Sequence, residues 1–309
     1  MKVAILDMGT NVFNLLITDV SEDGYEILKV LKVPSKIGEG GITKGILTQT
    51  AFDSARIAIG ELKSAINEMG GVESFRGIAT SAVRDAANSA DFLSMVNREF
   101  GIEAEAISGN REAELIYKGV RESMLLYNEV FLIMDIGGGS NEFIIADKYQ
   151  IYWKRSYNMG VVRLREMFPP SDPISEKELT HLERYYDENM SDLWEAVGRY
   201  KPTLLIGCSG SFDTLRELIY TEDDGTVPSM EIEKEKFISL HNKLIRSVRE
   251  ERAAMPGMSP IRVDYIVIGS ILVNLVIEKT AITDIHQSSY SLKEGYMAEI
   301  YESFLQKKL

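Results

Sequence analysis

The stretch LIMDIGGGS, residues 132–140, decides the fold because it repeats an earlier stretch, AILDMGTN, residues 4–11. In each copy an apolar run ends at an aspartate, glycine follows, and a second apolar run begins. Asp7 aligns with Asp135, and every aligned pair of residues is 128 positions apart (135 − 7 = 128). The pattern predicts two β-hairpins whose turns expose a carboxylate and backbone N–H groups, since glycine lets a ligand approach the backbone closely. Two such hairpins indicate a duplicated domain with a shared cleft.

Two ordinary tight turns with acidic residues are the structural alternative to this interpretation. The run Gly137–Gly139 has, however, more glycines than a tight hairpin turn requires. Outside the hairpins, segments with strand-like and helix-like patterns alternate, which is typical of an α/β fold. Strands are predicted at 3–6, 13–20, 25–33, 78–80, 102–107, 130–134, 204–206 and 263–268, and helices at 48–69, 83–99, from 111, 175–199, 212–219, 232–250 and 271–277.

The composition limits the function. The chain has 309 residues, and 34 Lys and Arg against 47 Asp and Glu give a formal net charge of −13. At about 150 residues per domain, this length predicts two domains. The acidic balance argues against binding a nucleic acid polymer or an anionic membrane, because such partners favour a basic face. A polyanionic small substrate would therefore need a locally positive site.

Cysteine and histidine exclude several kinds of site. A single cysteine, Cys208, rules out an internal disulfide framework and fits a reducing compartment; we predict a small buried residue there rather than a nucleophile. His181, His241 and His286 lack the spacing of a zinc site. The N-terminus shows no signal-peptide pattern, and no apolar run approaches the roughly 18 residues of a membrane span, so we expect a cytoplasmic protein without membrane contact.

Two later segments also place small residues between an apolar run and a predicted helix. They are LLIGCSGS, residues 204–211, and VDYIVIGS, residues 263–270. Backbone N–H groups at the start of a helix favour an anion. Small residues equally serve close packing of a strand on a helix, so both interpretations stay open for each segment.

Seven motifs, taken in order, carry a resemblance to a known family. They are DMGTN (7–11), ATSAVRDA (79–86), ISGNREA (107–113), DIGGGSNE (135–142), GVVRL (160–164), GCSGS (207–211) and SLKEG (291–295). Together they resemble the short, two-domain members of the exopolyphosphatase/guanosine pentaphosphate phosphatase family, within the actin, sugar-kinase and heat-shock-ATPase superfamily. The resemblance runs from about residue 3 to about residue 300. It implies two ribonuclease-H-like α/β domains around an interdomain cleft, one of residues 1–124 plus 292–309 and one of residues 125–291.

The resemblance also implies a site. The family uses water and Mg²⁺ to remove a terminal phosphate from linear polyphosphate or from guanosine pentaphosphate. Glu112 matches the general base that orients or deprotonates the attacking water. Asp135, with Asp7 in the paired role, matches the residue that holds Mg²⁺ directly or through water. The residues that match phosphate contacts are Thr10, Asn11, Arg84, Gly137, Gly138, Gly139, Ser140, Ser209, Gly210 and Ser211.

Three of the matched side chains have a plain structural alternative. Glu112 stands near a predicted helix start, where a carboxylate stabilises the helix dipole. Arg84 has the forked donors that suit phosphate, but it could equally pair with a surface carboxylate. Arg163 matches a motif arginine, and we assign it a structural role as readily as a binding one.

The chain departs from the family pattern at three positions. Val12 stands where a serine is usual, which removes a hydroxyl donor from the first loop. Arg111 stands where a second acid is common, so it would add positive charge beside Glu112, which could hold a polyanion or lower the pKa of the base. Asn141 replaces a serine or threonine after Ser140. Glu112 and Asp135 are both kept, so we still expect hydrolysis.

Four functions remain as hypotheses. The leading one is an Mg²⁺-dependent exopolyphosphatase, and the second is the same chemistry on guanosine pentaphosphate. The third is a kinase of the wider superfamily, and the fourth is a non-catalytic sensor of polyphosphate or nucleotide. A homodimer is a further open alternative. We expect the basic residues, Arg84 and Lys36 among them, to gather at the mouth of the cleft, because the rest of the chain is acidic.

Overall fold

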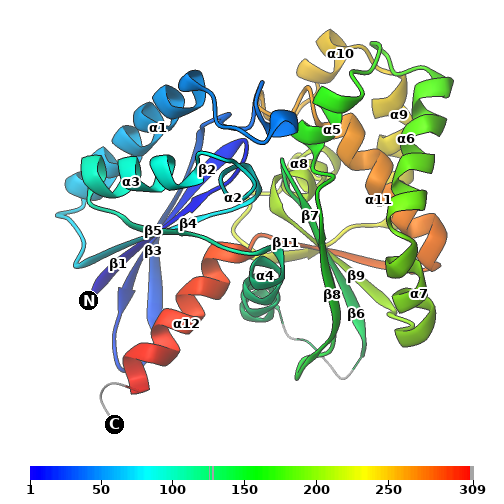
Figure 1. Cartoon of the computed structure of the whole chain (residues 1–309). Coiled ribbons are helices and arrows are strands. Elements are labelled where there is room, and N and C mark those ends of the chain that lie inside the picture. Colours follow the sequence, from blue (N-terminus) through cyan, green and yellow to red (C-terminus); the bar gives the residue numbers. More distant parts are fainter. Residues whose placement is uncertain (125, 127–128, 307–309) are drawn as a thin grey trace. The chain divides into compact units, whose positions relative to one another are not determined.

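The structure is a computed structural model that describes residues 1–124, 126 and 129–306 (Figure 1). The chain divides into two compact units: unit 1 comprises residues 1–119 and 292–309, and unit 2 comprises residues 120–291. Residues 125, 127, 128 and 307–309, which fall within the predicted domain ranges, lie outside the described residues.

Unit 1 contains a sheet of five strands in the order β3-β2-β1-β4-β5. The first three strands are antiparallel to their neighbours, whereas β4 and β5 add in parallel. This order and these directions are those of the predicted ribonuclease-H-like domain. The strands are β1 (Lys2–Met8), β2 (Val12–Val20), β3 (Tyr25–Pro34), β4 (Ser74–Ala79) and β5 (Glu103–Ala106).

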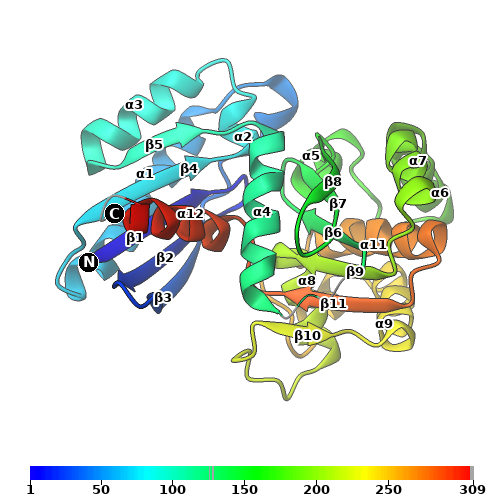
Figure 2. The ribbon, with the colours of Figure 1, turned by 90° about the horizontal axis from the view of Figure 1, so that it is seen from below.

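Helices cover both faces of this sheet, and strand β1 shows why. Its side chains alternate, so Ala4 and Leu6 belong to the core shared with α1 and α3, whereas Val3 and Ile5 pack with Met297 of α12. Figure 2 shows α12 lying along β1 and β2. The boundary between the units falls inside α4. The helices are η1 (Ile42–Lys44, a 3-10 turn), α1 (Gln49–Glu68), α2 (Ser81–Arg84), α3 (Ser89–Phe100), α4 (Gly109–Ser123) and α12 (Leu292–Gln306).

Unit 2 contains a sheet of six strands in the order β10-β11-β9-β6-β7-β8. Without the edge strand β10, it repeats the arrangement of unit 1: β6, β7 and β8 are antiparallel, and β9 and β11 add in parallel. The strands are β6 (Phe131–Ile136), β7 (Asn141–Ala146), β8 (Ile151–Tyr157), β9 (Leu204–Cys208), β10 (Ser229–Glu231) and β11 (Asp284–Ser288).

The internal repeat is confirmed down to its strand register. In unit 1, Asp7 lies opposite Asn14, and in unit 2, Asp135 lies opposite Glu142, so both pairs obey the same offset. The predicted α/β class with two ribonuclease-H-like sheets is therefore confirmed. Each aspartate lies in the last part of a central strand, just before its glycine turn.

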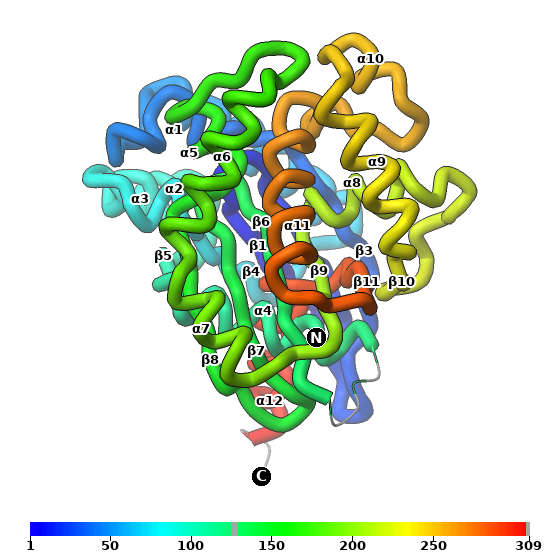
Figure 3. Tube along the Cα trace, turned by 90° about the vertical axis from the view of Figure 1, so that its right-hand side faces the viewer, coloured from blue at the N-terminus to red at the C-terminus, as the bar shows by residue number. Residues whose placement is uncertain are grey.

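The helices of unit 2 surround α11, which is apolar on nearly all sides and buried along most of its length. Figure 3 shows α11 between α6 and α9, and it also contacts α5, α7 and α8. The helices are α5 (Val161–Met167), α6 (Glu176–Asn189), α7 (Ser191–Tyr200), α8 (Ser209–Ile219), α9 (Lys234–Arg246), α10 (Arg249–Ala253) and α11 (Ile266–Thr280). Within the described ranges, no helix combines the length and the apolar character that crossing a membrane requires.

One predicted strand is wrong. Residues 263–268 are not a strand, because Ile266 begins α11 and Gly269 and Ser270 lie inside that helix. A continuous apolar run has no period, so it does not distinguish a buried helix from a buried strand. The Ser270 hydroxyl donates to the Val267 carbonyl and contacts Nδ1 of His241, so this segment offers no loop for phosphate.

Three predicted long helices are each two helices. The predicted helix 83–99 is interrupted because Asn88 forms two hydrogen bonds with the Leu47 backbone. The predicted helix 175–199 breaks at Met190, next to Asn189, whose side chain donates to the Tyr185 carbonyl. The predicted helix 232–250 breaks at Ser247, where α9 ends, and the Ser247 hydroxyl donates to the Leu244 carbonyl. At the second and third breaks the side chain bonds a carbonyl three or four residues earlier, and such local bonds compete with helix continuation.

Candidate functional site

The first hairpin places three predicted site residues at the end of β1. The Asn14 side chain donates a hydrogen bond of 2.9 Å to Oδ2 of Asp7. Thr10 and Asn11 are buried in the turn that follows, and their carbonyls accept hydrogen bonds from the backbone of residues 35–38. Within the described part of the chain, neither Nδ2 nor Oδ1 of Asn11 has a hydrogen-bond partner. A buried amide without a partner is unfavourable by about 1–3 kcal/mol, so it marks a place where a polar ligand would be stabilised.

Val12, the first departure from the family pattern, is a buried core residue at the start of β2. Lys36 follows close by, since its backbone N–H donates to the Asn11 carbonyl. Its side chain is exposed and lies 3.4 Å from a carboxylate oxygen of Glu39. The loop after β1 therefore has an exposed lysine beside it, and Glu39 partly neutralises the charge of that lysine.

Glu112 and Arg84 meet directly. Glu112 lies in the first turn of α4 and is only 7% exposed, and Nη1 of Arg84 donates to its Oε2 at 2.7 Å. Nε of Arg84 contacts Asp85 at 3.2 Å, and the Ser81 hydroxyl donates to the other oxygen of Asp85. The structure thus brings the predicted base and the predicted phosphate arginine together, with Asp85 as a second anchor. An arginine held by two carboxylates keeps its guanidinium plane fixed.

Arg111, the second departure from the family pattern, pairs with carboxylates on α4 and α12. Its guanidinium forms a two-pronged ion pair with Glu299 of α12, which Lys118 also contacts at 3.0 Å. Hydrogen bonding to Glu299 raises the pKa of Arg111 above its ordinary value. The side chain therefore ties α4 to α12, and its expected effect on Glu112 stays a prediction.

In unit 2, two hydroxyl groups converge on Asp135. Ser209 and Ser291 donate hydrogen bonds of 2.7 Å and 2.6 Å to its Oδ2, and the aspartate is 5% exposed. Ser209 begins α8 with a φ of 65°, an uncommon conformation for a residue other than glycine. The predicted metal residue and one predicted phosphate residue are therefore in contact, and Ser291 is a partner that the sequence did not predict for Asp135.

The glycine loop, Gly137–Gly139, rests on the start of α5. The N–H groups of Val161 and Val162 donate to the carbonyls of Gly137 and Gly138, and Nε of Arg163 donates to the Gly139 carbonyl at 2.9 Å. The glycine loop and the start of α5 come very close at Gly160, where an added Cβ would overlap the backbone of Gly138 and Gly139.

The structure gives a role to Asn141, the third departure from the family pattern, beside the glycine loop. Its Nδ2 donates to the Met159 carbonyl at 2.7 Å, which ties the start of β7 to the residue before Gly160. The amide that departs from the family pattern thus braces the segment against which the glycine loop packs. Its Oδ1 is buried and has no hydrogen-bond partner within the described residues.

Arg262 is a charged residue of this region that sequence reasoning missed. Its guanidinium packs against Gly210 so closely that a Cβ on that glycine would overlap it. Burial lowers the pKa of Arg262, while the negative charges of Asp213, Glu217 and Asp135 oppose that effect. No local pattern joins residue 262 to residue 210, so only the fold brings this positive charge to the predicted phosphate residues 209–211, which form the first turn of α8 rather than a loop. Ser211, the last of these predicted residues, is buried beside Gly269.

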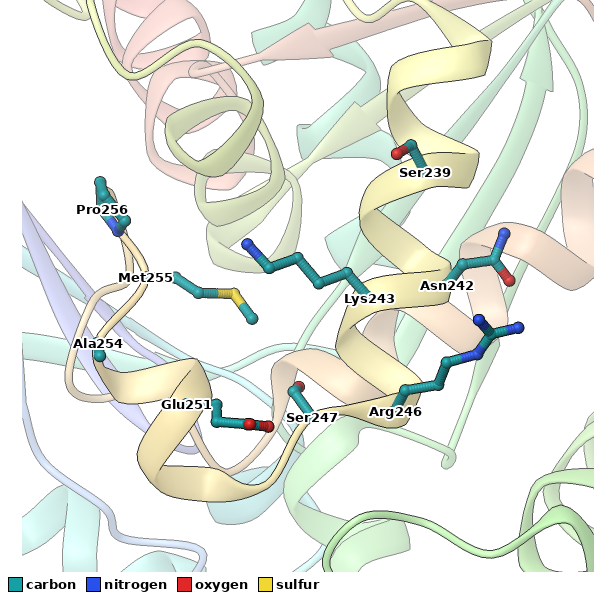
Figure 4. Close-up of a pocket in the computed structure, with 9 residues that line it drawn as sticks. All are labelled: Ser239, Asn242, Lys243, Arg246, Ser247, Glu251, Ala254, Met255 and Pro256. Atoms are coloured by element: carbon teal, nitrogen blue, oxygen red, sulfur yellow. The ribbon is translucent and has the colours of Figure 1, made fainter.

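A separate pocket of about 680 Å³ lies between α9 and the segment after α10 (Figure 4). Figure 4 shows Lys243 extending toward Met255, whereas Asn242 and Arg246 point the other way. None of the predicted site residues lines it. The lining residues are Ser239, Asn242, Lys243, Arg246, Ser247, Glu251, Ala254, Met255 and Pro256.

Comparison with known proteins identifies the family of this chain. The model of the Ppx/GppA phosphatase family matches residues 16–304, nearly the whole chain. The chain belongs to the Ppx/GppA phosphatase family. The predicted resemblance is therefore confirmed, and so is the predicted hydrolase class.

Relatives of this Ppx/GppA protein cover nearly its full length. A crystal structure of an exopolyphosphatase from Cytophaga hutchinsonii is 36% identical, covers 98% of each chain and superposes with a TM-score of 0.94. Exopolyphosphatase 1 of Mycobacterium tuberculosis is 28% identical, over 98% of this chain and 89% of its own length. The Aquifex aeolicus PPX-GPPA enzyme, 24% identical with a TM-score of 0.80, shares the fold.

Proposed function

We propose that this Ppx/GppA family member is an exopolyphosphatase, which uses water to release the terminal phosphate of inorganic polyphosphate. The observation that carries the proposal is its similarity, over 98% of the chain, to relatives named exopolyphosphatase. Water attacks the terminal phosphorus, the bond to the bridging oxygen breaks, and the products are orthophosphate and a chain one phosphate shorter.

Two groups are suited to bind the phosphoryl oxygens. The N–H groups of Gly138 and Gly139 donate no hydrogen bond within the described residues, although the carbonyls of the same loop are engaged by α5. The Asn11 amide is likewise buried without a partner there. Backbone N–H groups and a neutral amide bind anionic oxygen without adding formal charge, which suits a site on an acidic protein.

Glu112 is suited to accept the proton of the attacking water. Burial and the Arg84 ion pair hold its carboxylate in one orientation, which is what a general base needs. Arg84, with its forked donors, would in addition stabilise negative charge that develops on phosphate. In this proposal Asp85 keeps Arg84 in place.

Asp135 and Asp7 are the residues that would hold Mg²⁺. Their donor chemistry fits, because each is a hard oxygen ligand with hydroxyl or amide neighbours. In the described ranges no three His, Cys, Asp or Glu side chains are grouped as a metal cage. Mg²⁺ commonly uses one or two carboxylates and completes its shell with water and substrate phosphate, so a cage is not required. When bound, the ion would neutralise charge on the phosphate oxygens.

The test is phosphate release from polyphosphates of defined length and from guanosine pentaphosphate, measured in parallel with Mg²⁺ and with EDTA. We expect release from polyphosphate that EDTA abolishes and that added Mg²⁺ restores. Faster turnover of guanosine pentaphosphate at equal concentration would reassign the substrate within the family. Tight polyphosphate binding with no release in Mg²⁺ would instead indicate a sensor and would contradict the proposal.

A further inference from the structure

We propose that Arg163 is a positioning residue, which turns the backbone of the glycine loop so that its N–H groups face the phosphate. This inference rests on the proposed function, because it assumes that the loop binds a phosphoryl group. It starts from the observation that every glycine carbonyl of the loop is held from the same side, by the start of α5 and the residue before it.

The peptide plane converts those contacts into a direction for the N–H groups. In a trans peptide the C=O of one residue and the N–H of the next point in opposite directions. Because the carbonyls of Gly137 and Gly138 are held by Val161 and Val162, the N–H groups of Gly138 and Gly139 point away from α5. The third peptide, between Gly139 and Ser140, follows the same rule, so its carbonyl contact sets the direction of the Ser140 N–H.

This third peptide depends on a side chain. The Gly139 carbonyl accepts from the Gly160 N–H at 3.2 Å and from Nε of Arg163 at 2.9 Å. The arginine contact is the shorter, and a charged donor makes the stronger hydrogen bond. Glycine peptides reorient at little steric expense, so a loop of three glycines does not fix its own direction. The partner at Gly139 therefore decides whether Ser140 adds a third donor to the row.

Three successive N–H groups that point the same way form a concave site for an anion. Arg163 would orient the third of these N–H groups, that of Ser140, without touching the phosphate itself. A role of this kind differs from that of a residue that contributes charge to the substrate. It also differs from a role in stability alone, since the folded protein would persist while the loop reorients.

Variants at Arg163 separate these roles. We would measure polyphosphate affinity by calorimetry in the Glu112→Gln background, where turnover is suppressed, and KM and kcat in the otherwise unchanged protein. Arg163→Met removes the donor, Arg163→Gln keeps a neutral donor, and Arg163→Lys keeps a charged one. Arg165→Met is the matched control, because Arg165 is an exposed residue of the same helix whose nearest carboxylate contact is 3.5 Å.

We expect Arg163→Met to weaken polyphosphate binding about 10- to 100-fold, the effect of one charged hydrogen bond, and to raise KM more than it lowers kcat. Arg163→Lys should retain most of the affinity, Arg163→Gln should lose less than Arg163→Met because it keeps a weaker, neutral donor, and Arg165→Met should match the parent. Equal affinity for Arg163→Met at an unchanged melting temperature overturns the inference. Equal losses for Arg163→Gln and Arg163→Met also overturn it, because they would show that charge matters rather than the hydrogen bond.

The outcomes separate this inference from the proposed function. If the parent protein releases no phosphate from polyphosphate, the proposed function fails. If the parent is active and Arg163→Met behaves as the parent does, only the role of Arg163 fails. If Arg163→Met does not fold, the pair Arg163→Gln and Arg163→Lys still decides between a donor and a charge.

Discussion

Glu112→Gln is expected to lower kcat for phosphate release from polyphosphate by about 10²–10⁴-fold, the usual contribution of a general base. Glutamine has the same shape and can still orient a water molecule through its amide oxygen. It cannot take the proton, so the loss should appear in kcat rather than in KM. The measurement is steady-state phosphate release at saturating polyphosphate and Mg²⁺.

The structure supplies a matched control for this variant. Glu114→Gln makes the same change two residues further along α4, at a half-exposed carboxylate that lies 3.7 Å from Arg111. It should leave kcat within about twofold of the parent, because exposed ion pairs contribute little. In Glu112→Gln, Arg84 keeps its contact with Asp85, so the protein should remain folded at 25 °C. Full activity in folded Glu112→Gln would refute the role of Glu112.

The hairpins could be predicted from the sequence because their signals are local. An apolar run, an aspartate and glycine lie within a few residues of each other, and the second copy confirms the first. The offset then fixes the pairing: Leu6 lies opposite Leu15, and Met134 lies opposite Phe143. Strand register follows from such patterns, since a shift of one residue would turn the apolar side chains to the other face.

The contacts that complete the candidate site could not be predicted in this way. Ser291 reaches Asp135, and Arg262 reaches Gly210, across long stretches of sequence without a shared pattern. The prediction of a strand at 263–268 failed for a different reason. A nearly continuous apolar run has no hydrophobic periodicity that would distinguish a helix from a strand. Motif resemblance identified Glu112 and Arg84 separately, whereas their mutual ion pair is a property of the fold.

The acidic composition also has a clearer meaning. Two carboxylates of unit 1 are paired with basic side chains: Glu112 with Arg84, and Glu299 with Arg111 and Lys118. The groups suited to bind phosphate are largely neutral donors, the loop N–H groups and the Asn11 amide. A protein with a net charge of −13 therefore does not need an extended basic surface to hold a polyanion, because oriented dipoles can do so locally.

Gly160→Ala tests those oriented dipoles directly. The backbone of Gly160, with φ of −66° and ψ of 159°, is one that alanine adopts freely, so the variant carries no conformational strain. Its Cβ, however, would overlap the backbone of Gly138 and Gly139, which cannot move aside as a flexible side chain could. We expect the loop to shift and kcat/KM for polyphosphate to fall by about 10²-fold or more, the effect of displacing backbone donors from a developing charge.

Gly198→Ala is the control. It adds the same methyl group within unit 2, but at a position where no other atom is close enough to be overlapped. Gly198 lies within α7, and a Cβ there has no neighbouring atom within 4 Å. Gly198→Ala should keep full activity and raise the free energy of unfolding by up to about 1 kcal/mol. Gly160→Ala should lower it by about 1–3 kcal/mol through overpacking. If Gly160→Ala is as active as Gly198→Ala, the glycine loop does not bind the reacting phosphate in the orientation that α5 imposes.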